Sequence, residues 1–442
     1  MHLELPWKPQ PLVLDLPDTW EVIQPAPAEP APASAGDEID IVRQAMQSPL
    51  AATPLPDRDL AGKKVVVVVD DNTRPTPADR FFHLVLESLT AAGAAPESLL
   101  VIPALGIHTP LTEDEMAAKI GRDNLARVNW ENHRAFDQDA NFRLGTTGRG
   151  TPVSLNRHIA EADLVVLIGL IEPHLMAGFG GGLKNLLPGV AAAETIGRHH
   201  EILAEPPYQA NRVGMLPENN SFRLDLEEVR SLIPADIFCL NVILGHAGGI
   251  LACFAGDPVV AHRRGVDFSI RFFGLRLERP VDGVITNAYP MDINFKQSMK
   301  CVGNALPALR PGGVVMGFLR AERGLDDIPR PDGSPLPLGV IKFILRRLGP
   351  ARVYGFLNRT RKNLDIEEKF LYYYTFQLIR QYELFFYTPS LTPDIIKALF
   401  FFRGFPDNPQ TIIDQGRRRL GPRARVAVFP EGGATFPVIG GA

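Results

Sequence analysis

Residues 163–200 read DLVVLIGLIEPHLMAGFGGGLKNLLPGVAAAETIGRHH, and this stretch decides the fold. It opens with an uninterrupted apolar run, Leu164 to Ile171, which is typical of a strand buried on both faces of a parallel sheet. A polar loop follows, and after it a helix is predicted. The loop and the helix carry the chemically distinctive residues Glu172, His174, Gly178, Gly180, Gly181, Gly182, Lys184, His199 and His200. Strand, polar loop and helix in this order predict an α/β protein.

The glycine-rich loop favours an anionic ligand. Glycine lets the backbone approach a ligand closely, and amides that precede a helix can hold a phosphate. A Walker sequence is excluded, because Leu183 separates the last glycine from Lys184 and Asn185 stands where Ser or Thr is needed. The glycines are also too closely spaced for a dinucleotide fingerprint. The sequence therefore points to an anion that is not held by a common motif.

Length and composition limit the class of protein. The chain has 442 residues, 45% of them hydrophobic, and a formal net charge of -4. At about 100–200 residues per domain this length predicts two domains. The near-balanced charge argues against a nucleic-acid-binding protein, which would carry a basic stripe. We expect no signal peptide and no membrane span, because the N-terminus is polar and no apolar stretch reaches about 18 residues.

The cysteines indicate the compartment. Cys239, Cys253 and Cys301 show no CxxC spacing, so the sequence predicts neither a disulfide framework nor a cysteine zinc site. A reducing cytoplasm fits this pattern best.

The first predicted domain covers residues 1–265 and contains further strands that end in polar loops. Val65 to Val69 is one such strand and precedes DDNTRPTP, residues 70–77. Leu99 to Pro103 is another and precedes ALGIHTP. Ligands of open α/β sheets bind beyond the carboxyl ends of the strands, so these loops are expected to form the site.

The second predicted domain covers residues 266–419 and repeats the α/β pattern. Strands are expected at Gly283 to Asn287, Gly312 to Leu319 and Ala351 to Phe356, and a helix at Phe370 to Tyr387. The tail, residues 420–442, contains one more strand, which is expected to return to the first domain.

Each polar residue near a strand end has a structural alternative. Arg74 is suited to bidentate binding of a carboxylate, or it pairs with a nearby acid such as Asp70 or Asp71. His108 and His174 fit acid/base roles or structural hydrogen bonds. Lys184 contacts an anion or is solvated. The sequence by itself leaves these alternatives open.

A metal site built from protein ligands alone is not indicated. His199-His200-Glu201 lacks the second histidine of an HExxH motif, and the neighbouring histidines point to different faces of their helix. His200 is either half buried on a packing face or directed into the site. A metal would therefore arrive with a cofactor, or there is none.

Together these motifs resemble one family over essentially the whole chain. EPH, GFGGGLKNLLPG and the ETI before His200 are similar to the nickel-pincer-nucleotide-dependent lactate racemases and related 2-hydroxyacid racemases and epimerases. DNTRPTP at residues 71–77, ALGIHTPLTEDE at 104–115 and YPMDINFKQSMK at 289–300 carry the same resemblance.

The resemblance implies two α/β domains with a cofactor-binding cleft between them. The cofactor would be pyridinium-3,5-bisthiocarboxylic acid mononucleotide nickel, supplied by cofactor-synthesis enzymes. His200 would bind the metal, and Lys184 could be tethered to the cofactor. The other residues implied for cofactor binding are Asp71, Thr73, Gly178, Gly180, Gly181 and Gly182. Arg74, Gln297 and Lys300 would bind the substrate, and His108 and His174 would be the acid/base pair.

The implied reaction inverts a carbinol carbon. The hydroxyl proton would go to one histidine while a hydride leaves to the cofactor, and return of the hydride to the other face of a 2-keto intermediate would invert the centre. The chain departs from the family at Lys296, where lactate racemase has a tyrosine, and in having no tryptophan after Trp130. These departures leave a dicarboxylate or sugar acid open as substrate. An enzyme or sensor that binds a phosphorylated ligand without nickel is the alternative.

Overall fold

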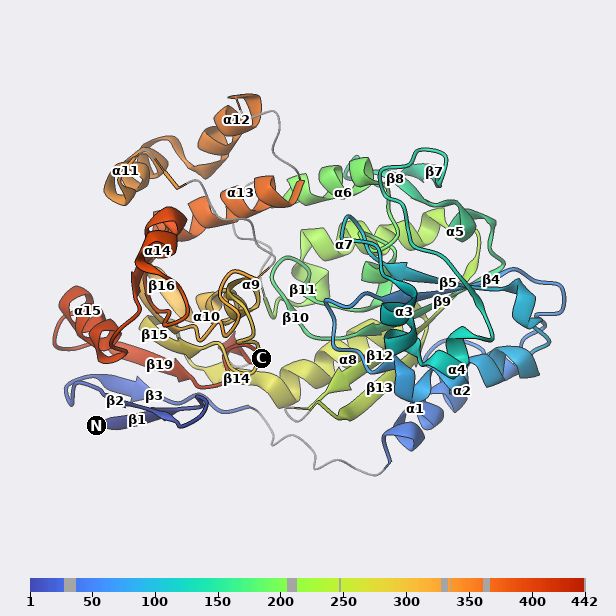
Figure 1. Ribbon diagram of the computed structural model, residues 1–442, viewed down its shortest axis with the longest axis horizontal. Coiled ribbons are helices and arrows are strands. Elements are labelled where there is room, and N and C mark those ends of the chain that lie inside the picture. The colour runs from blue at the N-terminus through green and yellow to red at the C-terminus, as the bar shows by residue number, and fades with distance from the viewer. Residues whose placement is uncertain are drawn as a thin grey trace. The chain divides into compact units, whose positions relative to one another are not determined.

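A computed structural model describes residues 1–27, 37–204, 213–245, 248–326, 333–334, 336–360 and 366–440. The chain divides into two compact units. The N-terminal unit comprises Pro30–Leu203 and Met215–Ser269, and the C-terminal unit comprises Met1–Glu29, Ala204–Gly214 and Ile270–Ala442. Each unit contains a largely or wholly parallel sheet with helices, so the predicted α/β class is confirmed (Figure 1).

The N-terminal unit is built on a sheet in the order β13-β12-β9-β4-β5-β6. Neighbouring strands are parallel except β12 and β13. Its strands are β4 (Val65–Asp70), β5 (Leu99–Ala104), β6 (Asn129–Trp130), β7 (Asn141–Thr146), β8 (Pro152–Asn156), β9 (Leu164–Leu170), β10 (Pro173–His174), β11 (Gly178–Phe179), β12 (Asp236–Leu244) and β13 (Ile250–Gly256). Its helices are α1 (Glu38–Gln47), α2 (Ala78–Ala91), α3 (Glu113–Ile120), α4 (Arg122–Leu125), α5 (Arg157–Glu161), α6 (Ala193–His200) and α7 (Ser221–Glu228), and α8 (Pro258–Phe273) contains the boundary between the units.

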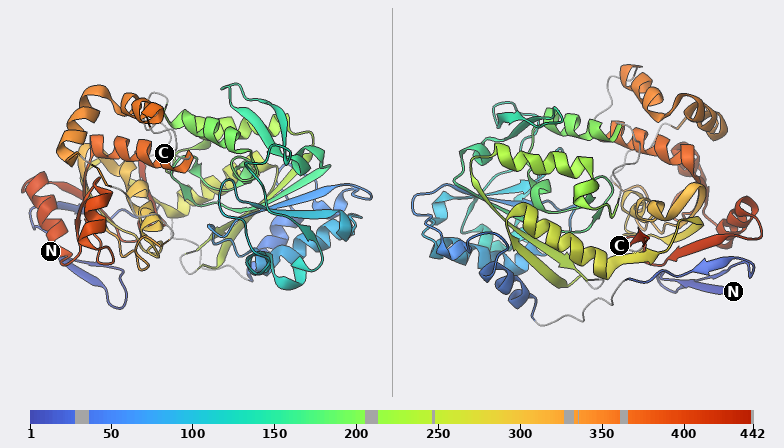
Figure 2. Two further views of the ribbon diagram at one scale, coloured as in Figure 1. Left: turned by 45° about the horizontal axis from the view of Figure 1, so that its top comes forward. Right: turned by 180° about the vertical axis from the view of Figure 1, so that it is seen from behind.

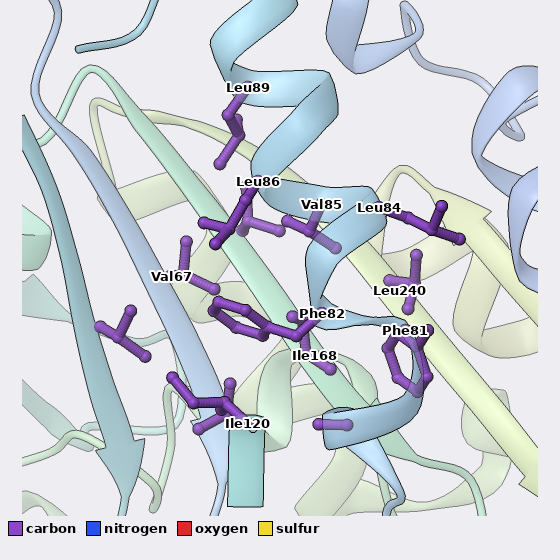
Figure 3. Packing of buried hydrophobic residues seen from close by; sticks show 14 of the residues in the cluster. Val67, Phe81, Phe82, Leu84, Val85, Leu86, Leu89, Ile120, Ile168 and Leu240 are labelled. Carbon is purple, nitrogen blue, oxygen red and sulfur yellow. The ribbon is translucent and has the colours of Figure 1, made fainter. Parts of the chain in front are cut away.

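Helix α2 shows how the hydrophobic pattern builds this unit. Phe82 and Leu86 lie one helical turn apart and point toward the sheet, where Val67 and Ile168 lie (Figure 3). All four side chains are at most 2% exposed. Full burial of one such side chain stabilises a fold by about 1.5–3 kcal/mol. The apolar runs that the sequence shows at β4 and β9 are buried because helices cover both faces of the sheet.

The strand order places a switch point between β4 and β9. From β4 the chain proceeds outward through β5 to β6, whereas from β9 it proceeds in the other direction to β12. At such a point the loops that leave neighbouring strands turn apart, and the crevice beyond the carboxyl ends is where ligands bind. The loops after β4 and β9 carry the residues that the sequence singles out.

The C-terminal unit has a second sheet, in the order β18-β17-β16-β15-β19-β3, with all neighbours parallel. Its strands are β1 (His2–Leu5), β2 (Leu12–Asp15), β3 (Glu21–Ile23), β14 (Gly274–Leu277), β15 (Val281–Asn287), β16 (Leu309–Phe318), β17 (Glu383–Tyr387), β18 (Arg403–Phe405), β19 (Arg425–Phe429) and β20 (Phe436–Ile439). Its helices are α9 (Phe295–Ser298), α10 (Lys300–Ala305), α11 (Leu338–Leu348), α12 (Pro350–Thr360), α13 (Ile366–Gln381), α14 (Pro393–Leu399) and α15 (Gln410–Leu420).

Both ends of the chain belong to this C-terminal unit. Strand β3 pairs with β19, and β19 pairs with β15, so the N-terminal strands lie beside the C-terminal ones (Figure 2). This differs from the expected division, which put residues 1–265 in the first domain and returned residues 420–442 to it. The sequence pattern of a short apolar strand is the same whichever sheet it joins, because its pairing partner is set by tertiary packing.

Two further expectations in the C-terminal unit were wrong. Ala351 to Phe356 lies in helix α12, not in a strand. Pro350 occupies the first position of that helix, where its missing N–H is tolerated, and Gly349 ends the preceding helix with a φ of 79°. The predicted helix at Phe370 to Tyr387 is confirmed as far as Gln381, where α13 ends, but its last part is strand β17, which begins at Glu383.

Within the described ranges, no helix is both long enough and apolar enough to cross a membrane.

Candidate functional site

An ion pair joins the two loops at the switch point. Nε of Arg74, after β4, lies 3.1 Å from Oε1 of Glu172, after β9. A terminal nitrogen of Arg74 also donates to the carbonyl and the hydroxyl of Thr73. Arg74 therefore has an acidic partner, but the partner is Glu172 and not Asp70 or Asp71. The pair fixes the guanidinium beyond the carboxyl ends of β4 and β9. The Arg74 side chain is 21% exposed there.

His108 is paired with a buried carboxylate. Its Nδ1 lies 2.6 Å from Oδ2 of Asp71, whose other oxygen accepts hydrogen bonds from the backbone N–H and the hydroxyl of Thr73. Burial raises the pKa of Asp71, but the bonds from His108 and Thr73 outweigh burial and the net pKa is lowered. Ionised Asp71 accepts the Nδ1–H of His108. The neutral ring then has its lone pair at Nε2, as a general base requires.

His174 has the opposite tautomer. It lies on β10 and pairs across the hairpin with Gly178 of β11. Its Nδ1 accepts hydrogen bonds from the backbone N–H groups of Met176 at 3.3 Å and Ala177 at 3.2 Å. A neutral imidazole that accepts at Nδ1 carries its proton at Nε2. In this neutral form the Nε2–H of His174 can donate a hydrogen bond. Transfer of a proton requires the imidazolium, in which Nδ1 is protonated and no longer accepts from Met176 and Ala177.

Arg223 of α7 binds the backbone of the glycine loop. Its guanidinium, 1% exposed, donates to the carbonyls of Phe179 and Gly181. Burial lowers the pKa of Arg223 to about 10, so the side chain stays charged at neutral pH. The loop is thereby fixed to α7, and a positive charge is placed beneath it.

The loop amides are largely used by the protein itself. Gly180 donates its N–H to the carbonyl of Glu172 at 2.8 Å, and Gly182 donates to Oδ1 of Asn241 at 2.8 Å. Nε2 of His262 lies 2.8 Å from the carbonyl of Gly180. The expectation that the glycine amides meet a phosphate is therefore not met by these two amides in this conformation.

Lys184 follows the loop, on a short 3-10 turn (Gly182–Asn185), in an environment that disfavours its charge. Burial, together with the positive charges of Arg74 and Arg223, lowers its pKa to about 7, although Glu172 and Asp71 act in the opposite direction. The neutral amine of Lys184 is therefore accessible near neutral pH. A neutral amine is nucleophilic, which a solvated lysine at this pH is not.

The two neighbouring histidines of α6 have different environments. His199 is fully buried, and its Nδ1 lies 2.7 Å from Oδ2 of Asp225. His200 is partly buried, and its Nδ1 donates to the carbonyl of Ile196 at 2.7 Å. Burial, with His199 nearby, lowers the pKa of His200 to about 3. His200 is therefore neutral, with its lone pair at Nε2.

This arrangement suits His200 as a metal ligand. Histidines that bind metals through one nitrogen usually donate the other N–H to a carbonyl or carboxylate, which fixes the ring. Within the described ranges, no group of three or more His, Cys, Asp or Glu side chains could hold a metal ion. The fit of His200 to a metal rests on its own geometry, a neutral ring whose Nδ1–H is held by the carbonyl of Ile196.

The predicted residues fall in both units. Arg74, His108, His174, Lys184 and His200 all lie in the N-terminal unit, and electrostatic coupling of Lys184 to Arg74 and His200 shows that these three are near one another. The other two predicted substrate ligands lie in the C-terminal unit, where Gln297 is on α9 and Lys300 begins α10. Asn294 caps α9 by accepting the N–H of Gln297 at 2.9 Å.

Sequence reasoning missed the supporting residues. These are three buried, charged side chains: Lys119, which contacts the 70–76 loop, Arg223, which contacts the glycine loop, and Asp225, which contacts His199. A charged residue within an otherwise apolar helix face would have been the signal for Lys119. Nothing in the local pattern marks Arg223 or Asp225, because their partners are distant in sequence.

Comparisons with known proteins agree on one family. Residues 9–211 match the family described as Lactate racemase N-terminal domain. The lactate racemase of Thermoanaerobacterium thermosaccharolyticum is 32% identical over 321 residues, which cover 71% of this chain and 73% of that protein. The lactate racemase of Lactiplantibacillus plantarum is 29% identical over 291 residues, 65% of this chain and 67% of that one.

Solved structures give the same result. The lactate racemase apoprotein from T. thermosaccharolyticum superposes with a TM-score of 0.80 at 25% identity, over 99% of this chain and 100% of that chain. A Thermotoga maritima protein shares the fold, with a TM-score of 0.63 at 18% identity over 92% of this chain and 99% of that chain. With these relatives and this site, the chain belongs to the lactate racemase family and is an enzyme of the isomerase class.

Proposed function

We propose that this protein interconverts the stereoisomers of a 2-hydroxyacid with a nickel-pincer nucleotide as cofactor. Lactate is the substrate named for its curated relatives, and we propose a substrate of the same chemical class here. The observation that carries the proposal is the Asp71–His108 pair. It supports a role for His108 as general base, and Arg74, a cation suited to a carboxylate, leaves the same turn as Asp71.

Arg74 is the proposed anchor for the substrate carboxylate. Glu172 and Thr73 hold its guanidinium, so the side chain is oriented before substrate arrives. Such preorganisation reduces the entropy lost on binding. Gln297 and Lys300 of the C-terminal unit are proposed as further ligands for the substrate.

Proton transfer is assigned to the histidines. His108 takes the hydroxyl proton at Nε2 while Asp71 stabilises the imidazolium that results. His174, as the imidazolium, donates its Nε2 proton on the other side of the carbinol carbon and becomes a neutral ring with a lone pair at Nε2, so the two roles exchange for the opposite stereoisomer. Arg74 keeps the planar 2-keto intermediate bound until the centre is re-formed.

The cofactor, when bound, would supply a hydride acceptor for the carbinol carbon. Nε2 of His200 is proposed as its metal ligand and the Lys184 amine as its point of attachment. Asp71, Thr73, Gly178, Gly180, Gly181 and Gly182 are proposed to line its site. Cofactor-synthesis enzymes are the proposed partners, and the cytoplasm remains the predicted location.

An isotope experiment tests this mechanism. The protein is co-expressed with the cofactor-synthesis enzymes and assayed with a 2-hydroxyacid deuterated at the carbinol carbon. A primary isotope effect is expected, and product formed in D2O from unlabelled substrate should keep its carbon-bound hydrogen. Solvent deuterium at that carbon would mean carbanion chemistry and would overturn the proposal. The alternative is an enzyme or sensor that binds a phosphorylated ligand without nickel. Intact mass and nickel content of the co-expressed protein distinguish the proposal from this alternative, because only the proposed enzyme should carry the nickel cofactor.

The substrate class is tested with a panel. Lys296 stands beside Gln297 at the start of α9 and adds a positive charge to this part of the C-terminal unit. Lactate, a 2-hydroxydicarboxylate and a sugar acid should be compared by kcat/KM. Preference for the dicarboxylate that disappears in Lys296→Met would assign the second carboxylate to Lys296.

A further inference from the structure

Lys119 is a buried lysine at the end of α3 that the proposed reaction does not use. Its side chain is only 4% exposed. The ammonium lies 2.7 Å from Oδ1 of Asp70 and donates to the carbonyl oxygens of Asp71 at 3.1 Å and Arg74 at 3.0 Å. The ammonium thus has one carboxylate as its ion-pair partner and donates hydrogen bonds to two backbone carbonyls.

The loop after β4 folds around this ammonium. The N–H of Arg74 donates to the carbonyl of Asp71 at 3.1 Å, so Asp71 and Arg74 are the ends of one turn, and Lys119 binds both of their carbonyls. The second oxygen of Asp70 accepts the hydroxyl of Thr76 at 2.5 Å, which fixes the far end of the loop. The main chain of the loop is thus held by Lys119, and the far end of the loop is held by Asp70.

Stability alone gives little reason for this arrangement. Removing a lysine and a carboxylate from water is costly, and a buried ion pair is often no more stabilising than apolar residues of the same volume. What apolar residues cannot do is hold two carbonyl oxygens at fixed positions. The side chains that leave this turn are Asp71, which pairs with His108, and Arg74, which pairs with Glu172.

We propose that Lys119 is a positioning residue that sets the placement of Asp71 and Arg74 by binding the backbone of the turn that carries both. This inference rests on the proposed function for the roles of His108 and Arg74 in catalysis. The placement of the turn itself does not depend on that function. Amide hydrogen exchange measures the placement of the turn, and KM measures its consequence for the substrate.

The test uses a pair of variants that separates charge from positioning. Lys119→Met leaves Asp70 as an unpaired buried carboxylate and should destabilise the protein. Asp70→Asn with Lys119→Met removes both charges, keeps an acceptor for Thr76 and should recover most of that stability. In the double variant the carbonyls of Asp71 and Arg74 still lack their donor. Its KM should therefore remain about 10-fold or more above that of the wild-type protein, as expected for the loss of a charge-assisted hydrogen bond.

The second readout needs no activity. Amide hydrogen exchange at residues 71–76 of the cofactor-free protein should be faster by about 10-fold in the double variant, while β4 keeps its protection. Lys342 provides the matched control, because it is also buried, donates to the carbonyl of Tyr382 at 3.2 Å and pairs with Glu383 at 2.8 Å. Lys342→Met with Glu383→Gln should change neither KM nor exchange at residues 71–76.

Wild-type exchange at residues 71–76 in the stable double variant would overturn the proposal, whatever the kinetics. Faster exchange with a wild-type KM would also overturn it, since the turn would then move without consequence for the substrate. If the wild-type protein racemises no 2-hydroxyacid, the proposed function fails. Exchange then still decides whether Lys119 holds the turn.

Discussion

At the scale of single residues, the site is defined by unusual protonation states. The pKa of Asp71 is lowered although the carboxyl is buried, His200 is neutral, and the pKa of Lys184 is lowered to about 7. Each state follows from particular neighbours, and each suits the proposed chemistry: a charge partner for a base, a lone pair for a metal, and a nucleophilic amine. These states also make the site testable without substrate.

Lys184 should react with amine reagents at an unusually low pH. In cofactor-free protein, competitive labelling with acetic anhydride followed by mass spectrometry should give a midpoint near pH 7 for Lys184, compared with about 10.4 for solvated lysines. Labelling rises as pH rises through the midpoint, because only the neutral amine reacts. Arg74→Gln should move the midpoint upward, since it removes a positive neighbour. A wild-type midpoint near 10 would contradict the environment described for Lys184.

The two histidines of α6 should respond in opposite ways to substitution. His200→Ala should leave the melting temperature nearly unchanged and abolish nickel retention in protein co-expressed with the cofactor pathway, measured by elemental analysis. His199→Ala should lower stability by about 2 kcal/mol or more, because it removes one of the buried partners of Asp225, which keeps only the hydroxyls of Thr147 and Thr151, and leaves a cavity in place of the ring. Wild-type nickel retention in His200→Ala would remove His200 from the metal site.

At the scale of elements, the glycine loop is constrained by the protein as much as by any ligand. Gly181 has φ 76° and ψ -177°, a region that is essentially restricted to glycine. A Cβ there would lie 2.9 Å from Oδ1 of Asn241 and 3.0 Å from the carbonyl of Leu170. The cluster of glycines is therefore explained in part by packing against β9 and β12.

Gly181→Ala should lower the free energy of unfolding by about 2–5 kcal/mol, from backbone strain and close contacts together. Gly150 is the control, because it also has a positive φ, 87°, but a Cβ there would meet nothing within 4 Å. Gly150→Ala should cost only about 1–2 kcal/mol. Urea unfolding monitored by circular dichroism measures both. Equal losses would mean that contact with Asn241 and Leu170 is unimportant.

The elements show which parts of the fold were predictable. Strands β4 and β9 were found because their apolar runs are continuous, and the loops after them because polar residues follow at once. Helix α12 was mistaken for a strand because a short segment with Val353, Tyr354 and Phe356 fits either period. In the site, Arg74, His108 and Lys184 could be named from motifs. The pairings of Arg74 with Glu172 and of His108 with Asp71 could not be predicted, although both acids stand in the quoted motifs, because pairing is decided by the strand order.

At the scale of the whole molecule, the two ends of the sequence build one unit. Leu14, on the N-terminal hairpin, is 1% exposed and belongs to a cluster with Met316 and Phe318 of β16 and Val426 of β19. Along the sequence, the whole N-terminal unit thus stands between the N-terminal strands and the residues that bury them. The sequence pattern shows that Leu14 is apolar but cannot show which core receives it.

Leu14→Ala should therefore destabilise the C-terminal unit. A loss of about 2–5 kcal/mol is expected for a fully buried leucine, and hydrogen exchange should show weaker protection in β16 and β19 while β4 and β9 keep theirs. Val13, its neighbour in β2, is 58% exposed, so Val13→Ala should change stability by no more than about 0.5 kcal/mol. If protection were lost only within the N-terminal hairpin, that hairpin would be a peripheral attachment. Loss in β16 and β19 would instead show that residues 12–15 and 425–429 unfold as one cooperative unit.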